Sequence, residues 1–472
     1  MKVDFLDEPE LEFGAGRHID SRFGLINYGP LDILEEVAPR QIEVGIAGTR
    51  EDMARTVEWL ERCRTPIAAK KSSHPNLAPA FPGFRPDAAF YSTLVLDESL
   101  QKEIPAREFE ALSKKEDVDL LVTESVRLFT DAFKYLSEHT AAKVLLCPVP
   151  QQLVELLNPD SRPGGKTPPD FHDLLKAQCL HLKPLQVMLP STADPKRARK
   201  LKIRDQTKSV QDDATRAWNF HTALYYKAHG RPWRLPRVSS ALKTCFVGVS
   251  FYRSVDKKTV MVSMAQVFDE RGEGVVVRGG QVDVDKTDRT LHLTAEDSAS
   301  LLIEALARYR SIHRHPPARI VVHKTSRFNA AELDGFRQGA EAEKIEVLDF
   351  ISLSEGTDQR LFRYGKYPPL RRTLFALDNR DYLLYTRGSV DFFETYPGMY
   401  VPRPLLFRCE ATEETPKNLA RELLALTKMD WNRTRFDGYS PLTIEAARRV
   451  GDILRYVPLG EKDIADSYAR YM

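Results

Sequence analysis

The strongest constraint on the fold is a change of pattern in the second half of the chain. Three apolar segments follow one another with only short turns between them: TCFVGVSFYR, TVMVSMAQVF and EGVVVRGGQVDV. Such close spacing is typical of an antiparallel meander. Two helix–strand units are predicted to follow, with helices at 295–310 and 330–342 and strands at 318–324 and 344–353. Together these elements predict a mixed α/β unit.

A meander followed by two helix–strand units has the strand order of an RNase H-like fold. The segment GRPWRLP precedes the meander, and its glycine and two prolines predict a linker because they interrupt both helices and strand ladders.

The first half of the chain alternates strands and helices instead. The segments IEVGIAG, VDLLVTES and AAKVLLCPVP are short and rich in Val, Ile and Leu, which predicts buried parallel strands. Amphipathic helices are predicted at 49–63 and 125–139, and further helices from Phe171 and over 213–229. This alternation predicts a layer with a central parallel sheet.

Composition limits the class of protein. A chain of 472 residues, with 42% hydrophobic and 29% charged residues, predicts a soluble protein of two or three domains. The acidic N-terminus lacks an apolar signal core, and no apolar stretch could span a bilayer, so we expect a cytoplasmic protein without a membrane partner. The five scattered cysteines form no CxxC pair and predict neither a disulfide framework nor a zinc site.

Charge is nearly balanced at +2, which excludes a general polycation but leaves room for local patches. The stretch 194–210 carries seven basic residues and only two acids. It is either a solvated surface or a strip that contacts phosphates.

The segment PPDFHDLLKAQ predicts a helix start with Asp170 at the N-cap, which places His172 and Lys176 on one face. Exposed backbone N–H groups and the helix dipole make such a terminus a natural anion site. An ordinary surface pair at i, i+4 spacing is the alternative.

Two further elements are weak alone. Gln186 is a polar residue inside the apolar strand KPLQVML and needs hydrogen-bond partners, which neighbouring backbone could supply. In the next long helix, Asn219, Ala223 and Lys227 share a stripe, and Lys227 could simply complement the helix dipole.

Taken together, these elements resemble the MID domain of Argonaute proteins, which has a Rossmann-like fold. The resemblance implies that His172, Lys176, Gln186, Asn219 and Lys227 bind the 5′-phosphate of a guide strand. Ala223 departs from the family, where many members carry another lysine at that position.

The same resemblance implies a divalent cation, expected to be Mg²⁺, that joins the guide phosphate to the chain's terminal carboxylate. Met472 and Gln186 are the residues that it implies as metal ligands.

The second half extends the resemblance. VVHKTSRF is similar to a strand of the Argonaute PIWI domain, and TKMDWNRTRFDGYSPLTIEAARRVGDIL is similar to its closing helical region. The whole chain resembles short prokaryotic Argonautes that lack a PAZ domain. We therefore expect an N-terminal extended segment over 1–30, a MID domain over 31–235 and an RNase H-like PIWI domain over 236–472.

Cleavage by an Argonaute needs carboxylates that hold two divalent cations. By the resemblance, three of these positions fall on Ser250, Thr325 and Arg448, none of which is acidic. The nearby acids Asp430, Asp437 and Glu445 are interpreted as structural. We therefore expect a catalytically inactive PIWI domain, with no catalytic residues.

The resemblance implies a guide-dependent sensor of a prokaryotic immune system, acting against phages and plasmids. It would bind a guide RNA (or DNA), recognise a complementary DNA target, and activate a partner that carries an APAZ region. A sirtuin-like NAD-consuming partner is favoured over a TIR partner, with NAD depletion and abortive infection as the outcome. The alternatives are an active guide-directed endonuclease and a small-molecule α/β enzyme, although no glycine-rich phosphate loop follows a strand.

Overall fold

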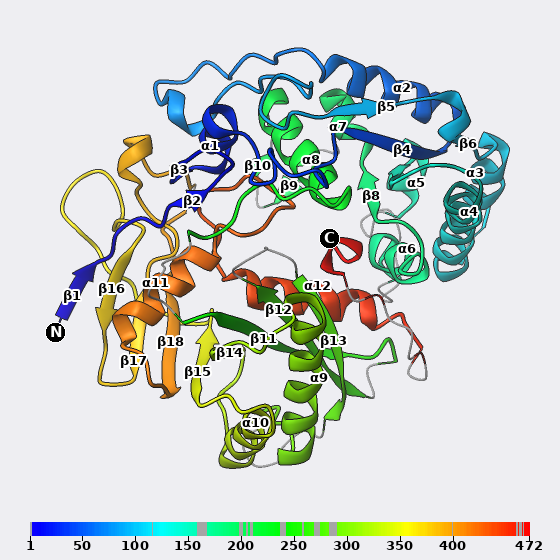
Figure 1. Cartoon of the computed structure of the whole chain (residues 1–472). Helices are drawn as coiled ribbons and strands as arrows, with labels where there is room; N and C mark the ends of the chain where they lie inside the picture. The colour runs from blue at the N-terminus through cyan, green and yellow to red at the C-terminus, as the bar shows by residue number, and fades with distance from the viewer. Residues whose placement is uncertain are drawn as a thin grey trace.

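The computed structural model of the chain describes residues 2–115, 117–157, 168–197, 202–203, 206–207, 211–236, 242–256, 259–268, 274–282, 290–398, 400–458, 461, 465 and 467–472. Figure 1 shows two α/β layers, one above the other, each built on its own sheet. No helix among the described residues is both long and apolar enough to cross a membrane.

The first layer contains a parallel sheet in the order β5-β4-β7-β8, with β6 also pairing with β4. Its strands are β4 (Gln41–Gly48), β5 (Thr93–Val95), β6 (Gln101–Glu103), β7 (Val144–Pro148) and β8 (Leu185–Met188). Helices α2 (Arg50–Arg62) and α8 (Asp213–Lys227) cover one face. Helices α3 (Ala106–Ser113), α4 (Val118–His139), α5 (Gln151–Leu156) and α6 (Phe171–Gln178) cover the other.

Side-chain caps fix the first residues of three of these helices. The side chains of Thr49, Asp170 and Asp212 each accept a hydrogen bond from a backbone N–H in the first turn of α2, α6 and α8. Each cap satisfies one of the N–H groups that a helix start leaves without a partner.

One sequence-based expectation is wrong. VDLLVTES is not a strand but the beginning of the 22-residue helix α4, which starts after the N-cap Asp117. The buried residues of this helix recur at helical spacing: Leu121, Val122, Ser125, Val126, Phe129, Ala132, Phe133 and Leu136. A short apolar run fits a buried strand and a buried helix equally well. Here the buried positions repeat at helical spacing over 22 residues, which identifies a helix.

The second layer confirms the RNase H-like order. Strands β11 (Thr244–Arg253), β12 (Val260–Phe268) and β13 (Gly274–Val282) form the antiparallel meander. Strands β14 (Arg319–Lys324) and β15 (Val347–Ser354) then pair in parallel on the other side of β11. Helices α9 (Ala295–His313) and α10 (Ala330–Ala342) cover one face, and α11 (Pro416–Leu426) and α12 (Leu442–Leu454) cover the other.

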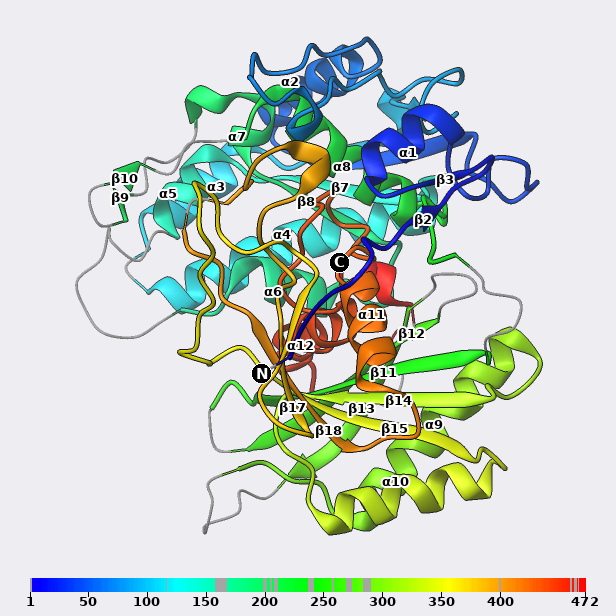
Figure 2. The same cartoon turned by 90° about the vertical axis from the view of Figure 1, so that its left-hand side faces the viewer.

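The second sheet extends beyond this unit. After β15 come β18 (Leu405–Ala411), β17 (Asp381–Leu384), β16 (Thr373–Ala376) and, at the edge, β1 (Lys2–Phe5). Figure 2 shows this N-terminal strand against the second layer before the chain crosses to the first. The segment 1–30 is therefore not uniformly extended, since it also contains a short hairpin of β2 (Leu11–Glu12) and β3 (Arg17–His18), and helix α1 (Ser21–Tyr28).

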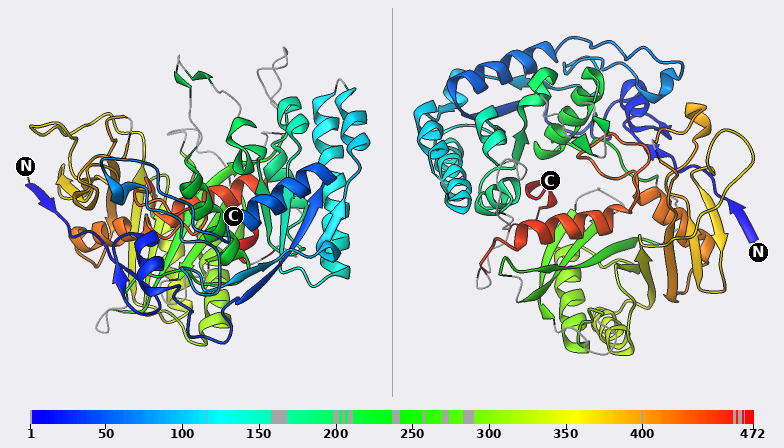
Figure 3. Two further views of the ribbon diagram at one scale, coloured as in Figure 1. Left: turned by 90° about the horizontal axis from the view of Figure 1, so that it is seen from above. Right: turned by 180° about the vertical axis from the view of Figure 1, so that it is seen from behind.

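The two layers share one hydrophobic core at their junction. Trp431 packs edge-on against Tyr226 of α8 with ring centroids 4.7 Å apart, and the Trp233 indole N–H donates to the Lys428 carbonyl at 3.1 Å. The last residues of the chain lie between the layers, where Met472 is buried (Figures 1 and 3). Residues far apart in the sequence therefore meet at this junction.

Candidate functional site

Lys176 is one of two buried lysines at the junction. It lies in the last turn of α6 and is only 1% exposed. Its Nζ donates to the Leu185 carbonyl at 2.8 Å and to the main-chain oxygen of Met472. Burial lowers the pKa of the Lys176 ammonium to about 7, and the charge of nearby Arg449 adds to this effect.

Lys227 is the second buried lysine and is the last residue of α8. Its Nζ donates to Oε1 of Gln186, whose own amide donates to the Val187 carbonyl at 3.1 Å. Burial lowers the pKa of Lys227 well below its usual value, and the positive charges of Lys176 and Arg449 lower it further. The structure thus brings three predicted residues, Lys176, Gln186 and Lys227, into one cluster.

Arg449 of α12 supplies a third cation from the second layer, and it was not among the residues predicted for the site. Its guanidinium donates to Asp430 Oδ2 at 3.2 Å and to the Tyr468 hydroxyl at 3.4 Å. Burial alone would raise the pKa of Asp430, but the charges of Arg449 and Arg433 outweigh it and hold the pKa below its usual range. The only signal in the sequence was the pair of adjacent arginines in IEAARRV.

The position of α12 is set by a close contact with β11. A Cβ atom at Gly248 would lie 2.1 Å from the Thr443 carbonyl oxygen, so the first turn of α12 can approach this strand only because residue 248 is glycine. This contact fixes the helix that carries Arg449.

The charge balance of this cluster favours an anion. Among the described residues, the buried lysines donate to the main-chain oxygens of Leu185 and Met472 and to the side-chain amide of Gln186, and neither is hydrogen-bonded to a side-chain carboxylate. The half-buried Arg449 is paired with Asp430 and lies 3.8 Å from Glu445. Buried cations without paired charge are costly, and the low lysine pKa values reflect that cost. A phosphate group would supply the missing negative charge.

The anion site differs from the one expected from α6. The N-terminus of that helix is capped by the Asp170 side chain, whereas Lys176 lies in its last turn. Lys227 likewise ends α8. Both lysines therefore approach from helix C-termini, where the dipole repels anions, so the side-chain charges have to provide the attraction.

No described contact joins His172 to the lysine cluster. It is exposed in the first turn of α6, and its Nδ1 is 2.9 Å from Asp173 Oδ1. Asp170, His172 and Asp173 offer ligand atoms that all lie within 4.8 Å of one another, but the group is largely exposed to solvent. The expectation that His172 contacts the phosphate remains a prediction.

A cavity of about 490 Å³ adjoins the cluster and is lined by Gln186, Asn219, Ala223 and Asn432, among others. Asn219 Oδ1 accepts hydrogen bonds from the backbone and hydroxyl of Thr434 at 2.8 and 3.0 Å. Asn219 therefore ties α8 to the second layer while lining the same cavity as Gln186.

The oxygens expected to hold a divalent cation are engaged by lysines. The Met472 main-chain oxygen accepts from Lys176, and Gln186 Oε1 accepts from Lys227. Divalent cations need oxygen ligands, and the positive charge of the two ammonium groups at these oxygens repels a cation, so the cluster favours an anion over a bare divalent cation. The divalent cation at the guide phosphate therefore stays a prediction.

The three positions compared with catalytic carboxylates lie in the second layer. Thr325 directly follows the last residue of β14, Lys324, at the carboxyl end of the parallel pair of β11 and β14. Ser250 lies inside β11, one residue past its last pair with β14, and faces Ser263 of β12. The exposed Arg448 of α12 donates to Glu355 Oε1 at 2.5 Å. Glu355 follows the end of β15 and also accepts from the Ser440 hydroxyl.

The acids interpreted as structural are engaged by arginines. Asp430 pairs with Arg449, and Glu445 lies 3.8 Å from the same guanidinium. Asp437 is 2.9 Å from Arg435 and 3.4 Å from Arg387.

Comparison with known proteins finds similarity at the level of the fold. No family model and no curated protein matches the sequence. Clostridium butyricum Argonaute, solved with a guide DNA and a 19-mer target DNA, matches with a TM-score of 0.64 at 14% identity, over 97% of this chain and 53% of that chain. Drosophila Piwi matches with a TM-score of 0.61 at 12% identity, over 100% of this chain and 56% of that one.

Marinitoga piezophila Argonaute, solved with a 5′-OH guide RNA, matches with a TM-score of 0.56 at 10% identity, over 100% of this chain and 59% of that one. The chain thus has an Argonaute/Piwi fold and spans little more than half the length of these structures.

Proposed function

We propose that this chain binds a guide nucleic acid by its 5′-phosphate at the junction of the two layers, and pairs that guide with a complementary strand. The observation that carries the proposal is the pair of buried lysines Lys176 and Lys227, neither of which is hydrogen-bonded to a side-chain carboxylate, beside the half-buried Arg449. The likeness to an Argonaute solved with guide and target DNA supports it at the level of the fold.

In this proposal the side chains act by charge and position. A phosphate between the two ammonium groups raises their pKa values, so both lysines bind it in the protonated form. The contacts that hold them in the free protein, to Leu185, Met472 and Gln186, fix the Nζ atoms close to where the anion arrives. Base pairing of the guide, rather than side chains, would select the target.

The test compares guides that differ only at the 5′ end. Replacing both Lys176 and Lys227 with alanine is expected to weaken binding of a 5′-phosphorylated guide by roughly 100-fold or more, since each charged hydrogen bond contributes about 1.5–3 kcal/mol. Binding of a 5′-hydroxyl guide is expected to change little. Fluorescence anisotropy measures both affinities.

The matched control replaces two exposed lysines of the first layer, Lys134 and Lys143, which lie outside the cluster. Equal affinity of the wild-type protein for both guides would contradict the proposal. A preference for the hydroxyl guide would do so as well, and would match the guide bound by the Marinitoga piezophila structure.

We further propose that the chain does not cleave its target. Ser250, Thr325 and Arg448 stand where the family resemblance places carboxylates, and the nearby Glu355 is engaged by Arg448. We expect no cleavage of a paired target with Mg²⁺ or Mn²⁺. Guide-dependent cleavage that disappears on replacing Asp430, Asp437 or Glu445 would instead support the nuclease alternative.

The sensor role rests on the sequence resemblance alone. It proposes that target binding activates an APAZ-bearing effector, a sirtuin-like NADase in preference to a TIR NADase, in prokaryotic defence. Adding target to the guide-loaded complex with its effector should then start NAD consumption, and the Lys176/Lys227 double variant should abolish it. NAD levels that do not change on target addition would contradict this part without touching guide binding.

A further inference from the structure

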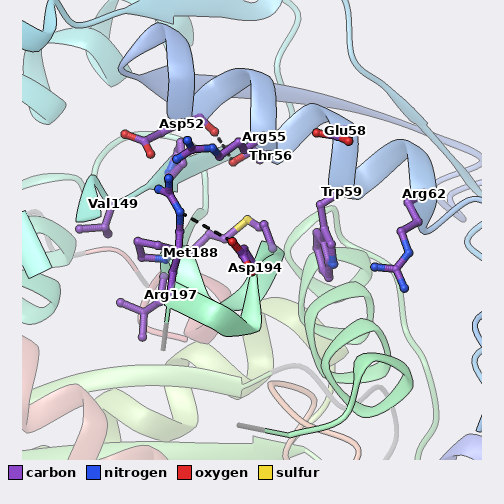
Figure 4. Close-up of a pocket in the computed structure, with 14 residues that line it drawn as sticks. Asp52, Arg55, Thr56, Glu58, Trp59, Arg62, Val149, Met188, Asp194 and Arg197 are labelled. Carbon is purple, nitrogen blue, oxygen red and sulfur yellow. Dashed lines mark hydrogen bonds and ion pairs between the residues drawn. The ribbon is translucent and has the colours of Figure 1, made fainter. Parts of the chain in front are cut away.

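A second cavity lies in the first layer and plays no part in the proposed phosphate site. It has a volume of about 250 Å³ and lies between α2, the residues that follow β7 and β8, and the short helix α7 (Pro190–Ala193). Figure 4 shows Asp52, Arg55 and Arg197 at one end of it, and Trp59 and Arg62 at the other.

The topology of the sheet makes this place a favoured ligand site. Adjacent strands β4 and β7 run parallel, but α2, which follows β4, covers one face, whereas α5, which follows β7, covers the other. Where successive connections leave for opposite faces, a crevice opens outside the carboxyl ends of the strands, and ligands of open α/β sheets bind there. The cavity includes Pro148 and Val149 at the end of β7, so it lies at this crevice.

Two guanidinium groups at one end of the cavity have spare donors. Arg55 pairs with Glu51 through one nitrogen, while its other terminal nitrogen, Nη1, is buried without a hydrogen-bond partner among the described residues. Arg197 reaches Asp194 and Glu51 only at 3.8 and 3.9 Å, beyond hydrogen-bond distance. By contrast, Arg62 at the far end is held by Asp213 at 2.8 Å.

The two arginines could bind an oxyanion such as a phosphate group. The other residues that line the cavity indicate what kind of molecule carries that group. Val149, Met188 and Pro190 form an apolar wall, and the carboxylates of Asp52 and Glu58 face the same space. Apolar walls accept the carbon skeleton of a ligand, and carboxylates accept hydrogen bonds from its hydroxyl groups. The cavity is small, so the ligand is small as well.

We propose that this cavity binds a small phosphomonoester that carries hydroxyl groups, such as a nucleoside monophosphate or a sugar phosphate. The phosphate lies between Arg55 and Arg197, and the hydroxyl groups lie toward Glu58. The cavity shares Leu189, Pro190 and Arg197 with the larger cavity beside Gln186, so the two sites are neighbours. The inference does not depend on guide binding.

Isothermal titration calorimetry on the full chain tests the proposal with AMP, ribose 5-phosphate and inorganic phosphate as probes. We expect AMP or ribose 5-phosphate to bind with a Kd below about 1 mM. Binding of both probes indicates a sugar-phosphate site, and binding of AMP alone indicates a nucleotide site. Replacing Arg55 or Arg197 with alanine is expected to weaken binding about tenfold or more.

Two further variants separate lost binding from lost structure. Arg50→Ala removes an exposed arginine of the same helix that pairs with Glu103 outside the cavity, and should leave binding unchanged. Ala193→Phe places a bulky side chain in the cavity and should block binding, while circular dichroism and guide affinity stay as in the wild type.

Three results would overturn the proposal: no heat of binding at millimolar probe, inorganic phosphate binding as tightly as AMP, or full binding by the Arg55 and Arg197 variants. A guide-loaded protein that no longer binds the probe would also overturn it, because the two arginines would then contact the guide itself.

Discussion

Two adjacent residues of helix α12 lie in two different regions, the junction of the two layers and the carboxyl edge of the second sheet. Arg449 enters the junction cluster, where it is hydrogen-bonded to Asp430 beside two buried lysines. Arg448, one residue earlier, points to the carboxyl ends of the second sheet, where it is exposed and meets Glu355. Successive residues of a helix face directions about 100° apart, so one helix serves both places.

The difference between the two sites is charge balance. At the junction, two buried lysines lie beside the half-buried Arg449, and burial together with the charge of Arg449 lowers the pKa of Lys176 to about 7. At the sheet edge, one cation meets one carboxylate in contact with solvent. Buried groups with strongly shifted pKa values cluster at functional sites, whereas a balanced exposed pair requires no ligand.

Of the changes that separate the junction from the sheet edge, the loss of Arg449 is expected to have the largest effect, and this effect is on guide affinity. Replacing Arg449 with alanine should weaken binding of a 5′-phosphorylated guide by roughly 10- to 100-fold, because one charge-assisted contact and the position of Asp430 are lost. Arg448→Ala is the matched control on the same helix, and its affinity should stay within about twofold of the wild type. Fluorescence anisotropy measures both affinities. Equal losses of affinity in the two variants would show that α12 contributes only its overall positive charge, without a specific contact of Arg449.

A second prediction concerns pH. In the free protein the pKa of Lys176 is lowered to about 7, and a bound phosphate raises it, so the bound form takes up a proton. Affinity for the 5′-phosphorylated guide is therefore full below pH 7 as far as this lysine is concerned, and it declines as the pH rises above 7. Between pH 7 and 8.5 we expect a loss of about tenfold.

Affinity for the 5′-hydroxyl guide should stay level over the same pH range, since it offers no phosphate to the lysine. Lys176→Arg, whose guanidinium remains charged, should reduce the pH dependence to the part that Lys227 contributes. A slope as steep as in the wild type would assign the titration to a group other than Lys176.

A third prediction tests whether a divalent cation takes part in guide binding at the junction. If a divalent cation joins the guide phosphate to the terminal carboxylate, chelation with EDTA should weaken binding of the 5′-phosphorylated guide but not of the 5′-hydroxyl guide. Because Lys176 and Lys227 already engage Met472 and Gln186, we expect a smaller loss than the one caused by raising the pH. A variant with one glycine added after Met472 moves the carboxylate and should no longer respond to EDTA.

The smallest effect is expected at the sheet edge. Removing the exposed Arg448–Glu355 pair by Glu355→Gln should lower the free energy of unfolding by less than about 1 kcal/mol, since solvent screens such pairs. Urea denaturation measures it. A loss of several kcal/mol would mean that the pair is a structural replacement for a metal site rather than a surface contact.

Much of the fold could be predicted because its signals are local. The meander, the helix–strand units and the cap Asp170 are set by residues close together in the sequence, and the structure agrees with them. The strand prediction for VDLLVTES was wrong because its apolar run fits either period, and only the buried stripe of α4 settles which one applies. The edge strand β1 pairs with β16 more than 360 residues later, and no local pattern indicates such a pairing.

The candidate site divides in the same way. Local sequence was enough to place Lys176, Gln186 and Lys227 on two helices and a strand of the first layer, because capping and periodicity fix those positions. The packing of the two layers, by contrast, brings Arg449 and Met472 to these residues and buries the lysines deeply enough to lower their pKa values. The physical reason is that burial and the balance of charge depend on which distant segments pack together, and local sequence does not record that packing.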